Sequence, residues 1–282
     1  MAEPFVNKLP SASKPRMRFP NGDLVNFLLK TSFSAQTLFL IGAILQIFIS
    51  AVLPFRWAIV PASILLLNSL VKTVHQTLLP GSSPLMEGVI PGRTTAQLPH
   101  SDGSMGPDPG NGSIVVFHLG IQFNHPLGLF FHGTREIHAS IQMMLKELRG
   151  KQEELGLLGY SAWQADERSS LNTLVLTFFF RDVESIHRFA YMDLHVKAWR
   201  DYDKSGYKTY LGVFHETYIV PAGAHESLYL NCRPVLLGRA SVKCTTGEGS
   251  GWVNTLVSAD TPALRSYYDR LGRDHKGNIK GC

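Results

Sequence analysis

The chain is most constrained by residues 33–53 (FSAQTLFLIGAILQIFISAVL), an apolar stretch without a charged side chain. As an α-helix at 1.5 Å per residue, this stretch would be about 31 Å long, close to the roughly 30 Å hydrocarbon core of a bilayer. Buried core helices are the alternative, but a helix without a polar face has no side to expose to water. The stretch therefore predicts a transmembrane helix.

A second apolar stretch, residues 57–71, follows after only the three residues 54–56. It is short for a membrane span, and Pro61 lies inside it, where proline disfavours a regular helix. The pattern leaves open a short second transmembrane helix and a helix that lies in the membrane interface. We therefore assign residues 33–79 to a membrane anchor of one or two N-terminal transmembrane helices.

Basic residues precede the anchor, in a tail that spans residues 1–32. The net charge of +5 and the isoelectric point near 9.1 are compatible with a nucleic-acid partner. No basic run is interleaved with aromatic residues, however, so we expect no nucleic acid. The positive-inside rule places such a tail in the cytosol. Its basic residues are Lys8, Lys14, Arg16, Arg18 and Lys30.

The number of spans decides where the rest of the chain lies. Two spans return it to the cytosol, whereas one span leaves it in the lumen, where the Asn111 sequon would be a glycosylation acceptor. Cys232, Cys244 and Cys282 include no C-x-x-C pair, which favours a reducing compartment, with a single Cys232–Cys244 bridge still open. We expect an integral membrane protein of the endoplasmic reticulum whose domain faces the cytosol.

A folded domain is predicted over residues 114–237, after a Pro-, Gly- and Ser-rich stretch, 80–113, that predicts a flexible linker. Its segments alternate between β-branched, aromatic runs and runs with a helical apolar period. The order βαββαβ predicts an α+β, ferredoxin-like fold with an antiparallel sheet and both helices on one face. Strands are expected at 114–123, 159–165, 172–180 and 211–220, with a fifth left open at 226–231, and helices at 134–155 and 182–204.

The sheet of such a fold has a second face that must be covered. In small sheets of this kind a second subunit commonly covers it, so we expect a homodimer in which two sheets enclose a cavity. The remaining residues, 238–282, form a poorly patterned C-terminal extension with a short helix expected at 261–271.

Three motifs of this domain resemble a known family. They are GIQFNHPLG at 120–128, YMDLH at 191–195 with Trp199, and GVFHETY at 212–218, which runs into VPAG. They resemble fungal, membrane-associated monooxygenases of secondary-metabolite clusters, related to the fumagillin-pathway monooxygenase in the dimeric α/β-barrel (ABM) superfamily. The resemblance covers residues 114–237 and the anchor. It implies a ferredoxin-like barrel that oxygenates a small hydrophobic metabolite, a polyketide or terpenoid, with O₂.

His195 is the first catalytic candidate, because an imidazole takes and returns protons near neutral pH. On the predicted second helix it lies on one stripe with Tyr191, Trp199 and Tyr202. Such a stripe suits a base and hydrogen-bond donors that line an apolar pocket, although an ordinary helix–sheet contact has the same pattern. We therefore take these three aromatic residues as candidates for substrate binding.

His215 and Glu216 are further catalytic candidates on the last predicted strand. Because successive strand residues point to opposite faces, only one of the two can face a given cavity. Glu216 shares its face with Phe214 and Tyr218, which gives the carboxylate an aromatic setting. The alternative is one core residue and one solvated residue. His118, on the first strand, lies on a sheet face and can join either set, so we take it as a candidate for substrate binding.

Asn124 and His125 follow the first strand and begin the segment NHPLG. Pro and Gly there indicate a shaped loop at the mouth of the sheet, which could gate a pocket, while a plain turn is the alternative. We take both residues as candidates for substrate binding.

Signatures of common cofactor and hydrolase sites are missing from the sequence, including the Rossmann glycine motif, the P-loop, the nucleophile elbow and H-E-x-x-H. We therefore predict no metal and no cofactor: a histidine removes a proton from an activated substrate, and the resulting anion reacts with O₂. Haem, held by His195 or His215, is the competing option. The alternative functions are a non-oxidative cyclase, isomerase or dehydratase of the same fold, and a non-catalytic metabolite-binding or scaffold protein.

Overall fold

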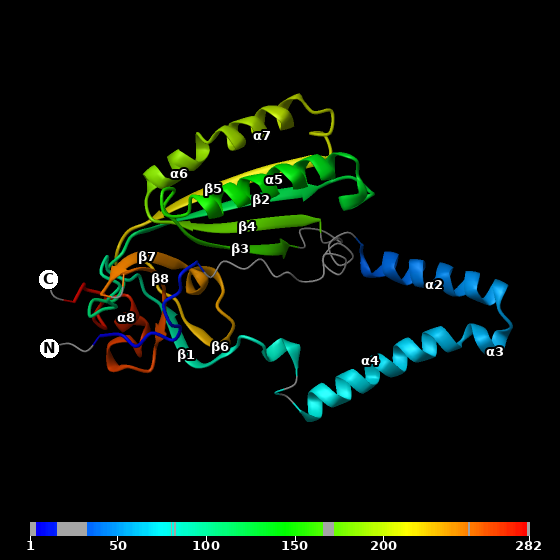
Figure 1. Cartoon of the computed structure of the whole chain (residues 1–282), viewed down its shortest axis with the longest axis horizontal. Helices are drawn as coiled ribbons and strands as arrows, with labels where there is room; N and C mark the ends of the chain where they lie inside the picture. The colour runs from blue at the N-terminus through cyan, green and yellow to red at the C-terminus, as the bar shows by residue number, and fades with distance from the viewer. Residues whose placement is uncertain are drawn as a thin grey trace.

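The computed structural model describes residues 4–15, 33–79, 81, 83–165, 172–247 and 249–280. Figure 1 shows a mixed α and β body from which two helices, α2 and α4, extend to one side. The described part of the chain has antiparallel sheets and two apolar helices ahead of them, so the predicted fold class is confirmed.

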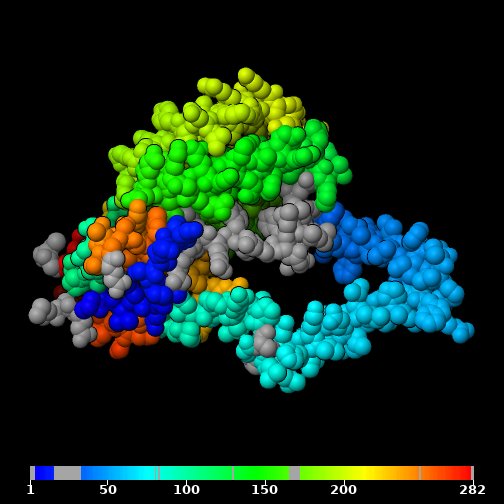
Figure 2. Space-filling view, in the orientation of Figure 1, coloured from blue at the N-terminus to red at the C-terminus, as the bar shows by residue number. Residues whose placement is uncertain are grey.

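The apolar stretches near the N-terminus form two helices joined by a short turn. α2 (Ala35–Val52) begins at Ser34, whose hydroxyl caps its first turn. After the short α3 (Phe55–Ala58), α4 (Val60–Leu78) runs back toward the domain. By length and composition alone, α2 and the segment Phe55–Leu78 could each cross a membrane. Beyond their ends nearest the domain, the two helices project away from the rest of the molecule in Figure 2.

Pro61 does not interrupt the second helix. It lies in the first turn of α4, where a backbone N–H has no intrahelical partner to lose. The helix therefore continues to Leu78, beyond the expected end at residue 71. Gln46 of α2 donates a hydrogen bond to the carbonyl oxygen of Ala58 over 3.2 Å, which ties α2 to the turn.

Four antiparallel strands form the main sheet, in the order β3-β4-β2-β5. One helix connects β2 to β3, and a second helical segment connects β4 to β5, which is the predicted βαββαβ order. The helical segments lie together on one side of this sheet (Figure 1). The elements are β2 (Ile114–Phe123), α5 (Gly133–Gly150), β3 (Leu157–Ala165), β4 (Thr173–Phe180), α6 (Val183–Ala190), α7 (Asp193–Lys204) and β5 (Leu211–Val220).

The helix expected over 182–204 is divided into α6 and α7. Met192 lies between them with an extended backbone, φ −62° and ψ 139°, and its side chain is buried in the core. Asp193 then occupies the first turn of α7, where negative charge is favourable. The core contact of Met192 accounts for the break, which a helical apolar period does not reveal.

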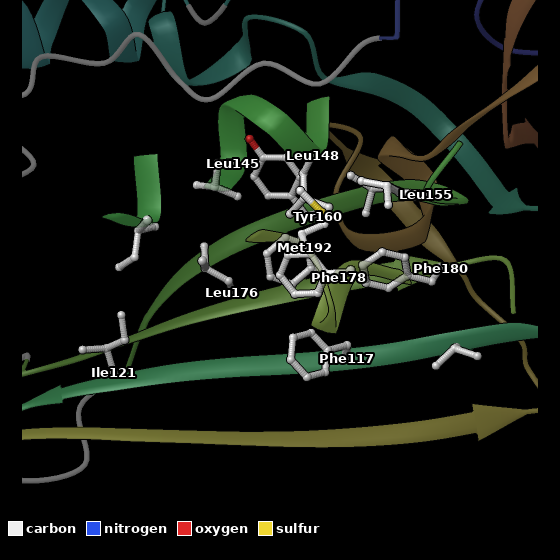
Figure 3. Close-up of a cluster of buried hydrophobic side chains, with 14 of the residues drawn as sticks. Phe117, Ile121, Leu145, Leu148, Leu155, Tyr160, Leu176, Phe178, Phe180 and Met192 are labelled. Carbon is white, nitrogen blue, oxygen red and sulfur yellow. The ribbon is translucent and has the colours of Figure 1, made fainter. Parts of the chain in front are cut away.

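The main core lies between the sheet and the helices (Figure 3). Leu145 and Leu148 of α5 meet Phe117 of β2 and Phe178 and Phe180 of β4 there, and each of these side chains is less than 10% exposed. The ring centroids of Phe117 and Phe178 are 6.0 Å apart. Because burial of such a side chain is worth about 1.5–3 kcal/mol, this layer fixes the sheet under the helices.

Residues 80–113, expected to be a flexible linker, contain a strand. β1 (Ile90–Ala96) lies between β6 (Tyr229–Cys232) and β9 (Leu256–Ser258) in a three-stranded antiparallel sheet. The linker prediction is wrong over this strand because a Pro-Gly pair near its start hides the strand pattern. The register of β1 and β6 shifts at this pair, and Gly92 has a φ of +84°.

The C-terminal extension is also ordered over its described residues. It adds β9 and the hairpin of β7 (Ser241–Thr246) and β8 (Gly249–Asn254). In place of the helix expected at 261–271, there is a 3₁₀ turn, Pro262–Leu264, and a four-residue helix, α8 (Tyr267–Arg270). We call β1 and β6–β9 with α8 the second module.

The second module packs on one end of the sheet face opposite the helices. Ile114, Leu158 and Phe179 from the main sheet meet Tyr229 and Leu256 in a second buried cluster. Part of the face that the sequence leaves for a second subunit is therefore covered within the chain. The homodimer stays a prediction, and the other end of this face carries the candidate site.

Candidate active site on the open face of the main sheet

Strand register brings four polar residues together on the face opposite the helices. His118 of β2 pairs with Thr177 of β4 on one side and with Glu216 of β5 on the other. Tyr218 lies on the same face because it is two residues beyond Glu216. Glu216 and Tyr218 are exposed, and His118 is half-buried. We call these four residues the sheet-face cluster.

Hydrogen bonds order the sheet-face cluster. His118 Nδ1 lies 3.1 Å from Thr177 Oγ1, and the Tyr218 hydroxyl donates to Glu216 Oε2 over 2.6 Å. The rings of His118 and Tyr218 meet edge to face, with centroids 5.9 Å apart. The hydrogen bond to the Glu216 carboxylate raises the pKa of Tyr218, because it stabilises the protonated phenol.

The His118 ring can serve as a base in one of its two neutral tautomers. When Nδ1 carries the proton, it donates to Thr177 Oγ1, and Nε2 is left as an acceptor. Among the described residues, Nε2 has no hydrogen-bond partner. The arrangement therefore leaves Nε2 available to a proton on a bound molecule.

An apolar shelf adjoins the sheet-face cluster. Phe214 of β5 lies over Gly120 of β2, and a Cβ at Gly120 would be 1.9 Å from Phe214 Cζ, so the ring needs glycine beneath it. Val175, which pairs with Gly120, also pairs with Trp163 at the far strand. Phe214 and Trp163 are 38% and 41% exposed. These aromatic surfaces can hold a flat or branched apolar molecule beside His118.

His215 lies on the opposite face from Glu216, as strand alternation predicts. It pairs with Leu119, and its ring centroid is 5.8 Å from that of Phe117, on the helix side of the sheet. The sheet therefore separates His215 from the sheet-face cluster.

His195 lies in the helical layer, away from the sheet-face cluster. Its Nδ1 is 2.9 Å from the carbonyl oxygen of Ala190, and its ring lies against Phe189, with centroids 5.0 Å apart. These contacts join the end of α6 to the start of α7. Of the rest of the predicted stripe, Tyr191 lies between the two helices, and Trp199 and Tyr202 are on α7. The Tyr202 hydroxyl donates to the Leu211 carbonyl oxygen over 2.6 Å.

Tyr191 and Trp199 point largely into solvent, at 81% and 57% exposed. Trp199 packs beside Tyr202, with ring centroids 5.7 Å apart. The stripe thus holds α7 in place at one end and faces solvent at the other. It does not reach Glu216 or His118, and its role in substrate binding stays a prediction.

Asn124 and His125 lie at the end of β2 in a packed loop. The Asn124 N–H donates to the Tyr210 carbonyl oxygen over 2.8 Å. The His125 ring stacks on Phe131 with centroids 4.6 Å apart, and its Nδ1 accepts from the Leu127 N–H over 3.1 Å. The loop is therefore an ordered end of the sheet, and its role in binding also stays a prediction.

Thr177 and the proximity of His118 to Glu216 escape sequence reasoning. Period-2 alternation groups Glu216 with Phe214 and Tyr218, but pairing partners across strands are not local properties. The available signal is topological, because the strand order of a ferredoxin-like sheet places the first strand next to the last.

The described residues contain no group of three or more His, Cys, Asp or Glu side chains placed to hold a metal ion. A haem held by His195 does not fit well, because Phe189 fills the sheet side of that imidazole and packs in turn on Phe117 and Phe178. A porphyrin between α7 and the sheet would displace this aromatic core.

Comparison with known proteins places the chain among enzymes. Residues 114–237 match the sequence family described as monooxygenase af470-like. A relative from Aspergillus fumigatus, named monooxygenase af470, is 46% identical over 268 residues, which are 94% of this chain and 97% of the relative. These matches define the class of the protein, an oxidoreductase of the monooxygenase type. The chain belongs to the monooxygenase af470-like family.

Solved structures with weaker similarity include two enzymes. An aldoxime dehydratase, OxdRE, in complex with butyraldoxime is 16% identical and covers 52% of this chain and 39% of its own, with a TM-score of 0.37. SnoaB, a cofactor-independent oxygenase from Streptomyces nogalater, is 11% identical and covers 37% of this chain and 90% of its own, with a TM-score of 0.27.

Proposed function

We propose that this monooxygenase is anchored in a membrane and oxygenates a small hydrophobic secondary metabolite, a polyketide or terpenoid, on the open face of the main sheet. One observation carries the proposal: His118, Glu216 and Tyr218 are hydrogen-bonded or in ring contact beside the shelf of Phe214 and Trp163. A base, a carboxylate and a phenol donor beside apolar surface are the groups that proton abstraction from an oily substrate requires.

The proposed chemistry needs no cofactor. His118 Nε2 takes a proton from an activated CH₂ group of the substrate, and the resulting carbanion transfers electrons to O₂. The CH₂ group becomes a carbonyl, one oxygen atom enters the product, and the other leaves as water, so the substrate supplies all four electrons. The Tyr218 hydroxyl, whose single proton is shared with Glu216 before the reaction, turns to donate its hydrogen bond to the negative charge that develops on oxygen.

The anchor is proposed to be a helical hairpin. α2 and the segment Phe55–Leu78 each have the length and composition of a span. Arg56 and Trp57, residue types found at membrane interfaces, lie in α3 at the start of the second segment, next to the turn of the hairpin. A hairpin returns the domain to the side of the basic N-terminal tail, which supports a cytosolic domain on the endoplasmic reticulum. A substrate that partitions into lipid would then be delivered near the site.

A second copy of the chain is proposed to cover the open sheet face. Trp163, Phe214 and Tyr218 leave an aromatic surface exposed there, and a dimer of facing sheets would exclude water from it. Exclusion of water would also protect the carbanion from being reprotonated before it meets O₂.

The proposal is tested with the full chain. We would purify it in detergent and record its absorption spectrum, and compare metabolites of a producing strain with and without the gene under ¹⁸O₂. The expected result is one labelled oxygen in the product and no haem or flavin absorption. A product without label would overturn the oxygenase in favour of a cyclase, isomerase or dehydratase, and a haem band would overturn the cofactor-free route.

Variants of the full chain separate catalysis from scaffolding. His118→Gln is expected to abolish most label incorporation, whereas the matched variant His138→Gln, on the exposed face of α5, should retain it. If His118→Gln keeps full pathway output while removal of residues 33–79 abolishes it, the protein acts as a scaffold.

A further inference from the structure

We propose that two loops of the domain, the Leu127–Phe130 loop and the Leu85–Met86 turn, dock into the headgroup region of the membrane that the hairpin crosses. The inference rests on the proposed anchoring and adds to it a fixed orientation of the domain. It assigns a lipid surface as the partner of these two loops, which we call the docking loops.

The Leu127–Phe130 loop lies beside the N-terminal end of α2, the first apolar helix. The ring of Phe33, just before α2, stacks on the ring of Phe130 with centroids 5.2 Å apart and an interplanar angle of 25°. Because α2 begins at Ala35, this contact places the loop beside the point where the chain would enter the bilayer. In Figure 2 the corresponding green edge of the domain lies next to the blue start of the helix.

The loop presents apolar side chains to the outside. Leu127 and Phe130 are each 59% exposed, and residues 124–131 contain no charged side chain. A loop tip of this composition is unusual in water but suits the boundary between headgroups and acyl chains.

The loop is rigid enough to present these side chains in a fixed direction. The Gly128 N–H donates to the His125 carbonyl oxygen over 2.8 Å, and the segment Gly128–Phe130 forms a 3₁₀ turn. Behind it, the His125 ring packs against Phe131 and Tyr210. This aromatic base joins the loop to the end of the main sheet.

The second docking loop lies at the foot of the other apolar helix. α4 ends at Leu78, and in the short turn that follows, Leu85 and Met86 are 78% and 52% exposed. Arg233 donates a hydrogen bond to the Pro84 carbonyl oxygen, which ties this turn to the chain that follows β6. The domain therefore has an exposed apolar turn at each foot of the hairpin.

Both docking loops face the side from which α2 and α4 leave the domain, while α8 lies at the opposite end (Figure 1). Contact of both loops with one lipid surface would fix the domain against the bilayer. It would also place Asn124 and His125, directly behind the first loop, between the lipid and the end of the sheet. An oily substrate could then reach the sheet without crossing bulk water.

The test uses depth-dependent fluorescence quenching in the full chain, reconstituted in phosphatidylcholine vesicles. A background with Cys232→Ser and Cys282→Ser leaves the buried Cys244. An environment-sensitive dye is attached through Leu127→Cys or Leu85→Cys. The control, Tyr267→Cys on α8, is 57% exposed, close to the 59% of Leu127, but lies at the far end, and Phe48→Cys in α2 reports on the anchor itself.

Lipids that carry a nitroxide at the headgroup should quench the dye at residues 127 and 85 about twofold or more beyond the control at residue 267. Lipids with a nitroxide deep in the acyl chain should quench the dye at residue 48. If the dye is quenched at residue 48, but at residues 127 and 85 no more than at residue 267, the docking loops are overturned and the anchor is supported. Quenching at one docking loop alone overturns the proposal for the other loop. No quenching at 48 overturns the anchor and the docking together. Unchanged thermal unfolding of each labelled variant shows that it is folded.

Discussion

The Tyr218 hydroxyl donates a hydrogen bond to Glu216 Oε2 over 2.6 Å, between two side chains on the same face of β5. The bond raises the pKa of Tyr218, because the carboxylate stabilises the protonated phenol and repels the phenolate. The phenol is therefore kept as a donor beside His118, whose ring it contacts edge to face. A donor placed next to a proposed base is the pairing that carbanion chemistry with O₂ calls for.

Glu216→Gln is expected to lower the pKa of Tyr218 toward that of an ordinary tyrosine. A glutamine oxygen accepts the same hydrogen bond but carries no charge, so the electrostatic part of the shift is lost. Titration of ¹³C-labelled tyrosine by NMR in detergent measures the change, with Tyr218→Phe identifying the resonance. An unchanged titration in Glu216→Gln would contradict the electrostatic effect of the Glu216 carboxylate on Tyr218. Because the pKa of Tyr218 is higher in the folded protein than in the unfolded chain, the hydrogen bond stabilises the fold fully below about pH 10. This stabilisation is lost as the pH rises through the folded pKa of Tyr218.

His118→Gln should lower kcat by about 10²- to 10⁴-fold, the usual contribution of a general base, with a smaller change in KM. Thr177→Val should have a weaker effect of the same sign, because it frees the ring without removing it. ¹⁸O incorporation per enzyme measures both. Equal losses in His118→Gln and in the control His138→Gln would refute a catalytic role for the sheet-face cluster.

Gly120→Ala should displace the Phe214 ring, because the new Cβ would lie 1.9 Å from its Cζ. Phe214 is on an exposed part of β5, so the ring can move out with a limited loss of stability, while the shelf beside His118 is lost. We therefore expect a clear rise in KM and only a small fall in the thermal midpoint of unfolding. In a Phe214→Ala background the same substitution should cost less, with a coupling of about 0.5–3 kcal/mol in the double-mutant cycle. Additive effects would show that the ring does not lie over residue 120.

Much of the main sheet is predictable from the sequence, since β2 and β5 carry local signals that do not depend on the rest of the fold. Their β-branched and aromatic runs give the strand boundaries directly. The anchor helices are predictable for a similar reason, because a long apolar segment without charge is typical of a membrane-spanning helix. The break at Met192 and the strand β1 are not, since both depend on contacts with distant residues: the core for Met192, and β6 and β9 for β1.

The candidate site is predictable in part. Glu216 and its aromatic neighbours follow from alternation within one strand, but their position beside His118 requires the register of two strand pairs. His195 illustrates the opposite case: its residue type and stripe suit catalysis, while its hydrogen bond to Ala190 gives it a structural task. Helical periodicity identifies a shared face but not what that face meets.

Asp182→Ala is expected to destabilise the domain by about 1 kcal/mol, because Asp182 caps α6 by accepting hydrogen bonds from Ser185 N–H, over 2.7 Å, and from its hydroxyl. Burial acts to raise the pKa of Asp182, but the hydrogen bonds from Ser185 and Arg181 outweigh it and lower the pKa. The cap therefore stabilises the fold above the ordinary aspartate pKa, about 3.9, and is lost as the pH falls through the lower folded value. Thermal unfolding in detergent should differ most between wild type and Asp182→Ala at neutral pH and converge in acid. A constant difference across that range would contradict the charged cap.

Arg270→Ala should destabilise the second module more strongly. The guanidinium, 5% exposed, donates to the Glu226 carboxylate and to the carbonyl oxygens of Leu264 and Arg265. Its removal leaves the carboxylate of Glu226, which is 17% exposed, without its partner, a loss of about 3–5 kcal/mol for buried pairs.

The matched control is Lys280→Ala, which breaks a more exposed pair with Asp269 and should cost at most about 1 kcal/mol. Limited proteolysis and thermal unfolding of the full chain measure both variants. Arg270 holds α8 in the second module. The protease should therefore cleave within residues 238–280 sooner in Arg270→Ala than in Lys280→Ala. Equal protease resistance in the two variants would show that the C-terminal extension does not depend on this ion pair.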